Sequence, residues 1–149
     1  MGRTVADRIV FVDTNVLIYS TRPSSSFHRR AIAALAKAAR RERRLVLSRQ
    51  VMREYLAVVT RPGGGSEPIA MAEAVADVER FAAAFEVLED GPEVGARLAE
   101  LCRSVVLGGR QVHDANIVAT MLAHGETRLL TANRGDFRRF EPRIEVVGL

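Results

Sequence analysis

The sequence predicts an α/β protein in which helices pack around a mostly parallel sheet. Short runs of Val, Ile, Leu and Phe recur along the chain, and segments with the roughly 3.6-residue periodicity of helices separate them. Continuous apolar runs are typical of strands that are buried on both faces of a parallel sheet. The 149 residues, 48% of them hydrophobic, are expected to form one domain, residues 1–149, with a substantial core.

The first predicted elements are a strand at residues 9–12 and a helix at residues 27–43. The strand is a short apolar run with β-branched residues, and it ends directly before an acidic residue. The helix is rich in Ala and Arg and places Ile32, Leu35 and Ala39 at helical spacing. It ends among arginines, whose positive charges complement the negative end of the helix dipole.

Caps and chain breakers mark the boundaries of the later elements. Ser48 is expected to cap a helix, and Asp90 and Glu93 resemble a capping box with Pro92 in the first turn. The glycines and prolines of residues 61–68 predict a flexible loop. The remaining strands are predicted at 45–47, 85–88, 128–131 and 144–147, and the remaining helices at 48–60, 69–84, 93–106 and 113–123.

Charge and composition narrow the class of protein. The formal net charge of +4 favours polyanionic partners, although Lys37 is the only lysine and the arginine excess also reflects GC-rich coding. Cys102 is the only cysteine, so no intramolecular disulfide can form, and we expect it to be a buried packing residue. No apolar run reaches the roughly 20 residues of a membrane span, and the N-terminus lacks the pattern of a secretory signal. We therefore expect a cytoplasmic protein.

Two acidic residues follow predicted strands. Asp13 comes directly after the first strand, and Asp136 lies in the segment after the strand at 128–131. Ligands of open parallel sheets bind beyond the carboxyl ends of the strands, so both residues are candidates for a site at that edge. Asp13 is also a candidate N-cap for a helix that starts at Thr14 or Asn15, and one carboxylate can do both. Asp136 is equally compatible with a plain turn.

Two further acidic residues lie on the apolar side of predicted helices. Glu54 shares a face with Val51 and Val58, and Asp114 shares a face with Val118. Burying an unpaired carboxylate costs on the order of several kcal/mol, so such positions need a physical reason. One alternative is that Glu54 pairs with a nearby arginine at the edge of the core. Another is that Asp114 only complements the dipole of its helix.

If these carboxylates converge, they need a cation. Two unit charges about 4 Å apart repel by about 4 kcal/mol at an effective dielectric constant near 20. A bound divalent ion removes that conflict. Oxygen ligands with few His or Cys residues nearby favour Mg²⁺ or Mn²⁺ over Zn²⁺.

Four segments carry a family resemblance: Phe11-Val12-Asp13-Thr14-Asn15-Val16-Leu17, Glu54 after the second strand, His113-Asp114-Ala115, and Leu130-Thr131-Ala132-Asn133 through Asp136-Phe137. In this order and spacing they resemble the PIN-domain ribonucleases, in particular the VapC-type toxins of toxin–antitoxin pairs. The resemblance covers residues from about Ile9 to Val147. It implies a three-layer α/β/α sandwich with a mainly parallel sheet of about five strands. It also implies Mg²⁺-dependent cleavage of RNA.

The resemblance also implies roles for individual residues. Asp13 and Asp114 match the family's main metal ligands, and Glu54 matches its third acid. The positions that match supporting residues of the site are Asn15, Thr131 and Asn133. Many members have an Asp where this chain has Asn133. Whether Asp136 replaces that acid, and whether a second metal binds, stays open.

The resulting hypothesis is hydrolysis of an RNA phosphodiester bond. Asp13 and Asp114 would hold Mg²⁺, which lowers the pKa of a bound water, and Glu54 and Asp136 would orient that water or help to hold a second ion. The residues expected to position the RNA backbone, chosen by their nearness to the motifs, are Arg22, Arg110 and Arg134. A toxin of this type would form a homodimer and bind a cognate antitoxin.

Three alternatives remain at this stage. A haloacid-dehalogenase-like phosphatase also begins with an Asp after a strand, but it needs a second Asp where this chain has Asn15. A non-catalytic metal-binding or RNA-binding module would use the acids only as caps and ion-pair partners. A PIN nuclease of RNA processing or decay would keep the chemistry without the toxin role.

Overall fold

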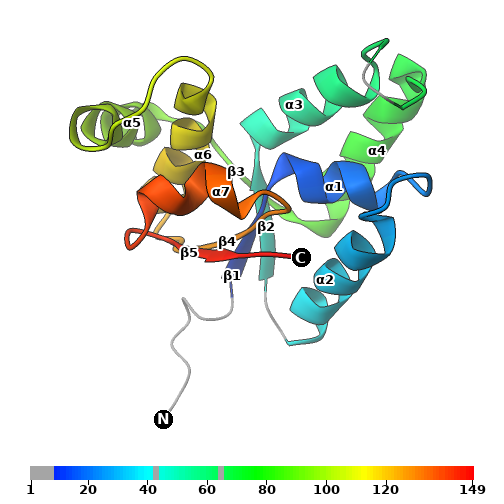
Figure 1. The fold of residues 1–149 in the computed structure, drawn as a ribbon, viewed down its shortest axis with the longest axis horizontal. Coiled ribbons are helices and arrows are strands. Elements are labelled where there is room, and N and C mark those ends of the chain that lie inside the picture. The colour runs from blue at the N-terminus through cyan, green and yellow to red at the C-terminus, as the bar shows by residue number, and fades with distance from the viewer. Residues whose placement is uncertain (1–8, 42–43, 64–65) are drawn as a thin grey trace.

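Five parallel strands form one sheet in the order β3-β2-β1-β4-β5 in the computed structural model, which describes residues 9–41, 44–63 and 66–149 (Figure 1). Every pair of neighbouring strands is parallel, so the predicted mainly parallel, five-stranded sheet is confirmed. The strands are β1 (Ile9–Val12), β2 (Arg44–Ser48), β3 (Glu86–Leu88), β4 (Arg128–Leu130) and β5 (Glu145–Val147).

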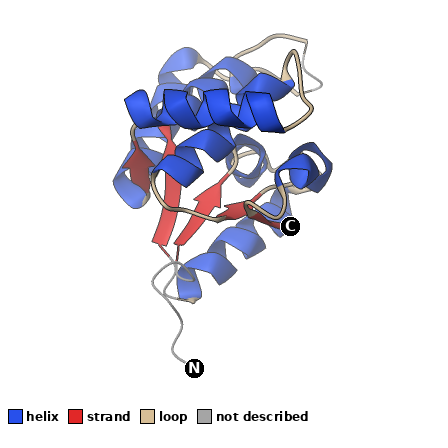
Figure 2. Ribbon diagram, turned by 90° about the vertical axis from the view of Figure 1, so that its left-hand side faces the viewer, coloured by secondary structure: helices blue, strands red, loops and turns tan. Residues whose placement is uncertain are grey.

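Helices flank the sheet on both sides, as the α/β/α prediction requires (Figure 2). In Figure 1, α1 to α4 gather on one side of the strands and α5 to α7 on the other. The helices are α1 (Thr14–Ser20), α2 (His28–Arg40), α3 (Arg49–Val59), α4 (Met71–Ala84), α5 (Pro92–Ser104), α6 (Gln111–Ala123), α7 (Arg134–Phe137) and the short 3₁₀ helix η2 (Arg138–Phe140). No helix in these described parts of the chain has the length and apolarity needed to cross a bilayer.

The central strand β1 fixes the place where a ligand can bind. All four of its residues are buried, and Phe11 pairs in register with Val46 of β2 on one side and with Leu129 of β4 on the other. The chain order reverses at this strand, because β2 and β3 lie to one side of it and β4 and β5 to the other. Such a switch point leaves a crevice beyond the carboxyl ends of the two diverging strands, here β1 and β4. Asp13 and Thr131 directly follow these two strands.

Several local predictions are confirmed at the caps. The Ser48 hydroxyl accepts a hydrogen bond from the Val51 N–H at 3.4 Å and caps α3, and Pro92 occupies the first turn of α5. Three predictions fall partly on residues that the structure does not describe. They concern the N-terminal stretch, predicted not to be a secretory signal, the last two residues of the helix predicted at 27–43, and Gly64 and Gly65 of the predicted loop.

The buried face of α2 differs from the predicted one. Ile32 is 46% exposed, whereas Ala31 and Ala38 are buried. Small side chains let this helix approach its neighbours closely, and the larger Ile32 then falls on the solvent side. The helix is therefore present and Leu35 packs against the core as predicted, but Ile32 and Ala39 are exposed.

Two predictions for the region around α5 are wrong. Cys102 is exposed, not buried, because Val94 and Leu101 supply the face of α5 that packs inward. Asp90 does not cap α5, since Gly91 is the N-cap and no side chain caps the helix. The Asp90 carboxylate instead accepts a hydrogen bond from the Asn116 side chain of α6 at 3.2 Å.

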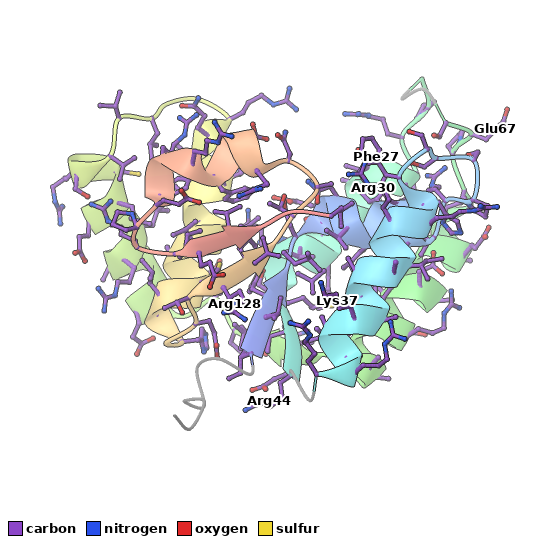
Figure 3. The ribbon with its side chains drawn as sticks, turned by 60° about the horizontal axis from the view of Figure 1, so that its bottom comes forward. Phe27, Arg30, Lys37, Arg44, Glu67 and Arg128 are labelled. Carbon is purple, nitrogen blue, oxygen red and sulfur yellow. The ribbon has the colours of Figure 1, made fainter. Side chains whose placement is uncertain are left out.

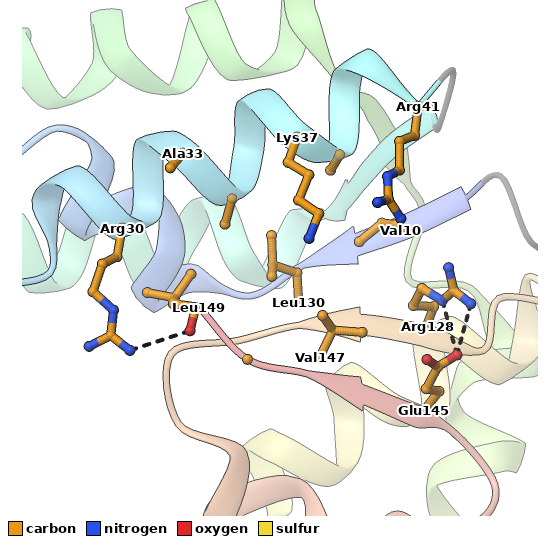
Figure 4. A pocket seen from close by; sticks show the side chains of 13 residues that line it. Val10, Arg30, Ala33, Lys37, Arg41, Arg128, Leu130, Glu145, Val147 and Leu149 are labelled. Atoms are coloured by element: carbon orange, nitrogen blue, oxygen red, sulfur yellow. Dashed lines mark hydrogen bonds and ion pairs between the residues drawn. The ribbon is translucent and has the colours of Figure 1, made fainter.

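A hollow of about 480 Å³ lies between α2 and the strands β1, β4 and β5 (Figure 4). Its floor is apolar, with Val10 and Leu130 among its lining residues, and its rim is cationic. Figure 3 shows Lys37 on α2 across from Arg128, whose guanidinium pairs with Glu145 at 3.0 Å. None of the acidic residues predicted for the active site lines this hollow, so it is a separate feature of the described surface.

Candidate functional site

Asp13 is a buried carboxylate at the carboxyl end of β1, only 6% exposed. Its Oδ1 accepts a hydrogen bond from the Thr14 N–H at 2.8 Å and caps α1, and its Oδ2 accepts one from the Thr131 hydroxyl at 2.8 Å. The pKa of Asp13 is raised from 3.8 to about 7, mainly by burial and with a smaller contribution from the negative charges of Glu54 and Asp114, while the two hydrogen bonds oppose the rise. The two interpretations of Asp13 are thus compatible: it caps a helix, and it lies where the site was predicted.

Thr131 ties the end of β4 to the start of α1. Its hydroxyl donates to Asp13 and accepts hydrogen bonds from the Asn15 side chain at 3.3 Å and from the Asn133 backbone N–H at 3.1 Å. The side-chain oxygen of Asn15 in turn accepts a hydrogen bond from the Ala132 N–H at 3.1 Å. Because one donor and two acceptor positions of the hydroxyl are all used, its single hydrogen points at Asp13.

Glu54 faces the same crevice from α3. Its Oε2 accepts a hydrogen bond from the Thr14 hydroxyl at 2.8 Å, and its Oε1 accepts one from the Gln50 side-chain amide at 2.8 Å. The alternative in which Glu54 pairs with an arginine is not found among the described residues, whose ion pairs all involve other acids. The hydrogen-bond donors that hold this half-buried carboxylate in the described part of the chain are therefore neutral.

Asp114 lies in the first turn of α6 and is half-buried, and its charge acts on Asp13. The pKa of Asp114 is raised from 3.8 to about 6, mainly by burial and further by the negative charges of Asp136 and Glu54. The positive charges of Arg139 and His113 oppose it. The dipole of α6 also favours an anion at this place, so both the structural and the site interpretation of Asp114 remain physically sound.

Asp136 is the exposed member of the group, in the first turn of α7. Its Oδ2 accepts a hydrogen bond from the Asn133 side chain at 2.7 Å. Sequence reasoning treated Asn133 and Asp136 as alternatives for one position. The structure instead pairs them, with the amide of Asn133 orienting the carboxylate of Asp136.

The three arginines predicted to bind RNA have different surroundings. Arg22 is engaged within the protein, because its guanidinium donates to the backbone carbonyls of Glu67 at 2.6 Å and Val59 at 3.0 Å. Arg110 and Arg134 are exposed and lie next to the N-terminal ends of α6 and α7, which carry Asp114 and Asp136. Their roles toward RNA stay predictions.

Sequence reasoning missed two polar residues beneath the acids, Gln50 and Asn116. Gln50 is buried at 5% exposure and bonds Glu54, and Asn116 donates to Gln50 at 2.7 Å. Spacing carried a signal for the first, since Gln50 lies four residues before Glu54 on one helix and shares its face. The contact with Asn116 joins residues 66 positions apart, which no local pattern reveals.

These residues suit a hard divalent cation held largely by water. Within the described residues, no group of three or more His, Cys, Asp or Glu side chains forms a ready-made metal cage. Mg²⁺ does not require one, because it keeps several waters and is commonly bound by one or two carboxylates. Asp13 and Asp114 have raised pKa values that a nearby cation would lower, which is what fits this pair to such an ion.

Known proteins match this chain over most of its length. The family model described as PIN domain matches residues 10–141. Over 134 residues the chain is 32% identical to "Ribonuclease VapC48" of Mycobacterium tuberculosis, which covers 87% of this chain and 90% of that protein.

Solved structures with the same fold include VapBC-1 of nontypeable Haemophilus influenzae, with a TM-score of 0.66 at 19% identity over 94% of this chain and 97% of that one. VapBC2 of Rickettsia felis, bound to a promoter DNA fragment, has a TM-score of 0.64 at 18% identity, over 95% of this chain and 98% of that one. VapC20 of M. tuberculosis, described as a toxin that cleaves the sarcin–ricin loop, has a TM-score of 0.63 at 18% identity, over 80% of this chain and 86% of that one. From the family match and the similarity in sequence, the chain belongs to the PIN-domain family.

Proposed function

We propose that this protein is an Mg²⁺-dependent endoribonuclease that hydrolyses RNA phosphodiester bonds, and that it is the toxin of a toxin–antitoxin pair. The observation that carries the proposal is the pair Asp13 and Asp114. Asp13 directly follows the central strand β1, the charge of Asp114 contributes to the raised pKa of Asp13, and the pKa of Asp114 is itself raised. Their position in a PIN domain similar to a named ribonuclease favours RNA as the substrate.

Asp13 and Asp114 are the residues that would hold the ion, with Mn²⁺ as a possible replacement. When bound, the ion supplies charge neutralisation and lowers the pKa of a coordinated water. Thr131 fixes the orientation of the Asp13 carboxylate through its 2.8 Å hydrogen bond. The carboxylates of Glu54 and Asp136 are the acceptors that would orient an attacking water. Asn15 and Asn133 hold the surrounding loop in place.

RNA would approach across the exposed rim of this crevice. Arg110 and Arg134 are the cations best placed to contact phosphates, because each is exposed beside a helix that carries a site acid. Contacts of this kind position the backbone without reading its sequence. Arg22 is the weaker candidate of the three, since both of its bonds are made to the protein's own backbone.

Conservative substitutions test the proposal. Asp13→Asn and Asp114→Asn should abolish Mg²⁺-dependent cleavage of a fluorescent RNA while the far-ultraviolet circular dichroism stays that of the wild type. Glu79→Gln, an exposed acid on α4, is the matched control and should cut normally. If either Asp variant cleaves at the wild-type rate, the assignment of the site is wrong.

The toxin role and the partners are tested in cells and in solution. The similarity to VapBC complexes supports a protein antitoxin as the partner, and a homodimer is expected with it. Induced expression in the bacterial cytoplasm should arrest growth with the wild type and not with Asp13→Asn, and coexpression of the product of a small neighbouring gene should restore growth. Light scattering of the purified chain measures the oligomer. Cleavage without growth arrest would favour the alternative of an RNA-processing or RNA-decay nuclease.

A further inference from the structure

Gln50 contacts Glu54 on α3 and two residues of α6, the helix that carries Asp114. Its side-chain nitrogen donates to Glu54 Oε1 at 2.8 Å and to the His113 backbone carbonyl at 2.8 Å. Its side-chain oxygen accepts a hydrogen bond from Asn116 Nδ2 at 2.7 Å. The residue is only 5% exposed, so these contacts replace water almost completely.

This amide has one satisfactory orientation. Both of its hydrogens and its oxygen have partners in the protein. Rotating the amide by half a turn would bring its oxygen against the Glu54 carboxylate and the His113 carbonyl, and its nitrogen against the Asn116 amide. Each buried polar group left unpaired costs about 1–3 kcal/mol, and more where a charge is involved. The orientation of Gln50 is therefore fixed by the three groups around it.

The second contact of Gln50 acts on Asp114. The carbonyl of His113 belongs to the peptide group that joins His113 to Asp114, in the first turn of α6. By bonding this carbonyl and the Glu54 carboxylate with one nitrogen, Gln50 joins the main chain at Asp114 to the side chain of Glu54. Asn116 secures the other end of the amide and is itself bonded to Asp90 at 3.2 Å.

We propose that Gln50 is a positioning residue of the nuclease site, which sets the separation between the Glu54 carboxylate and the turn that carries Asp114. The inference rests on the proposed function, because it assigns Gln50 to the acids named there. A neutral amide suits this task better than a cation. Lys or Arg at this position would pair with Glu54 and cancel the negative charge that a divalent ion requires, whereas Gln orients the carboxylate and leaves its charge in place.

Binding of Mn²⁺ in the absence of RNA tests this inference without relying on activity. Gln50→Met keeps the length of the side chain and removes all three hydrogen bonds. Residues that hold metal-binding groups in place typically change metal affinity or activity about 10- to 100-fold when they are mutated. We expect isothermal titration calorimetry to show Mn²⁺ affinity lowered within that range, and the Mg²⁺ concentration for half-maximal RNA cleavage to rise in parallel.

Gln111→Met is the matched control, because Gln111 lies in the first turn of α6, as Asp114 does. Among the described residues, its side chain accepts a hydrogen bond only from the Gly108 N–H, at 3.0 Å. This variant should bind Mn²⁺ as the wild type does. Urea unfolding of both variants separates a loss of stability from a loss of metal binding. If Gln50→Met does not fold, Asn116→Ala takes its place, since it frees the amide of Gln50 and should weaken Mn²⁺ binding in the same direction.

Asp114→Asn in the same titration distinguishes two kinds of failure. If Asp114→Asn loses Mn²⁺ binding while folded Gln50→Met or Asn116→Ala binds like the wild type, the role of Gln50 is overturned and the site assignment stands. If Asp114→Asn itself binds Mn²⁺ normally, the proposed site is wrong and the role of Gln50 falls with it. Weakened binding in Gln50→Met and unchanged binding in Gln111→Met is the result that the positioning role requires.

Discussion

Replacing Asp13 with Asn should inactivate the protein and yet stabilise it at high pH. The fold holds this carboxylate almost fully away from water, with its pKa raised from 3.8 to about 7. A carboxyl group with a raised pKa in the folded state stabilises the fold least where it is ionised. Ionisation of Asp13 therefore lowers the free energy of unfolding. This effect is absent below the unfolded-state pKa, grows as pH rises, and is complete above the folded-state pKa of about 7.

The magnitude follows from the two pKa values. The difference between 3.8 and about 7 corresponds to about 4 kcal/mol between the ionised and the protonated state. The side-chain carbonyl of Asn can still accept the hydrogen bond from the Thr14 N–H. Its NH₂ group, however, faces the Thr131 hydroxyl, and the lost hydrogen bond costs about 1 kcal/mol of stability. We therefore expect Asp13→Asn to raise the free energy of unfolding by about 3 kcal/mol at about pH 8.5, and by less than about 1 kcal/mol at about pH 5.

Urea unfolding in the presence of EDTA measures this difference, with both proteins examined at both pH values. Without EDTA and with Mg²⁺, the wild type should regain part of the deficit, because an ion bound only to the folded state stabilises it. The reasoning is refuted if Asp13→Asn is destabilising to the same extent at both pH values. That outcome would mean that the two hydrogen bonds to Asp13 outweigh its burial.

Three further substitutions separate stability from chemistry. Thr131→Val should lower the free energy of unfolding by about 1–3 kcal/mol and raise the pKa of Asp13 further, which a pH series of urea midpoints would detect. Tyr55→Phe should cost a similar amount, because it removes the 2.6 Å bond to the buried Asp77, while Mn²⁺ affinity stays unchanged in calorimetry. Arg22→Met should lower the thermal midpoint and leave the rate of RNA cleavage intact; a lost rate at an unchanged midpoint would instead establish an RNA contact.

The positions of the candidate site residues in the fold were predictable where they depend on local sequence. Asp13 follows an apolar run that has no alternation, and that pattern alone predicts a buried strand with its ligand edge at Asp13. Asp114 and Glu54 were predictable for a related reason, since an acid on the apolar side of a helix is costly unless something compensates it. Strand positions followed from the same pattern, because each of the five predicted strands corresponds to one strand of the sheet.

The parts that depend on packing between distant segments were not predictable. Which face of α2 is buried depends on how closely the helix approaches its neighbours, so hydrophobicity favoured Ile32 where the structure buries Ala31. The Gln50–Asn116 contact and the pairing of Asn133 with Asp136 are side-chain geometry, and a sequence shows only that such residues are polar. Asp90 has the spacing of an N-terminal cap for α5, but its carboxylate instead accepts a hydrogen bond from Asn116 on α6.

The raised pKa values of two site acids imply that metal binding and proton binding compete. In the metal-free protein, Asp13 with a pKa of about 7 and Asp114 with a pKa of about 6 are partly protonated near neutral pH. If a divalent ion binds these carboxylates in their ionised form, as proposed, its binding at about pH 6.5 must release protons, and its affinity must rise as pH increases through this range. Calorimetric titration of Mn²⁺ in two buffers with different ionisation enthalpies measures the number released. We expect proton release at about pH 6.5, none at about pH 8.5, and a smaller release for Asp114→Asn if it retains any binding. Equal heats in both buffers at about pH 6.5 would show that these carboxylates are already ionised, and that burial does not set the charge of the site.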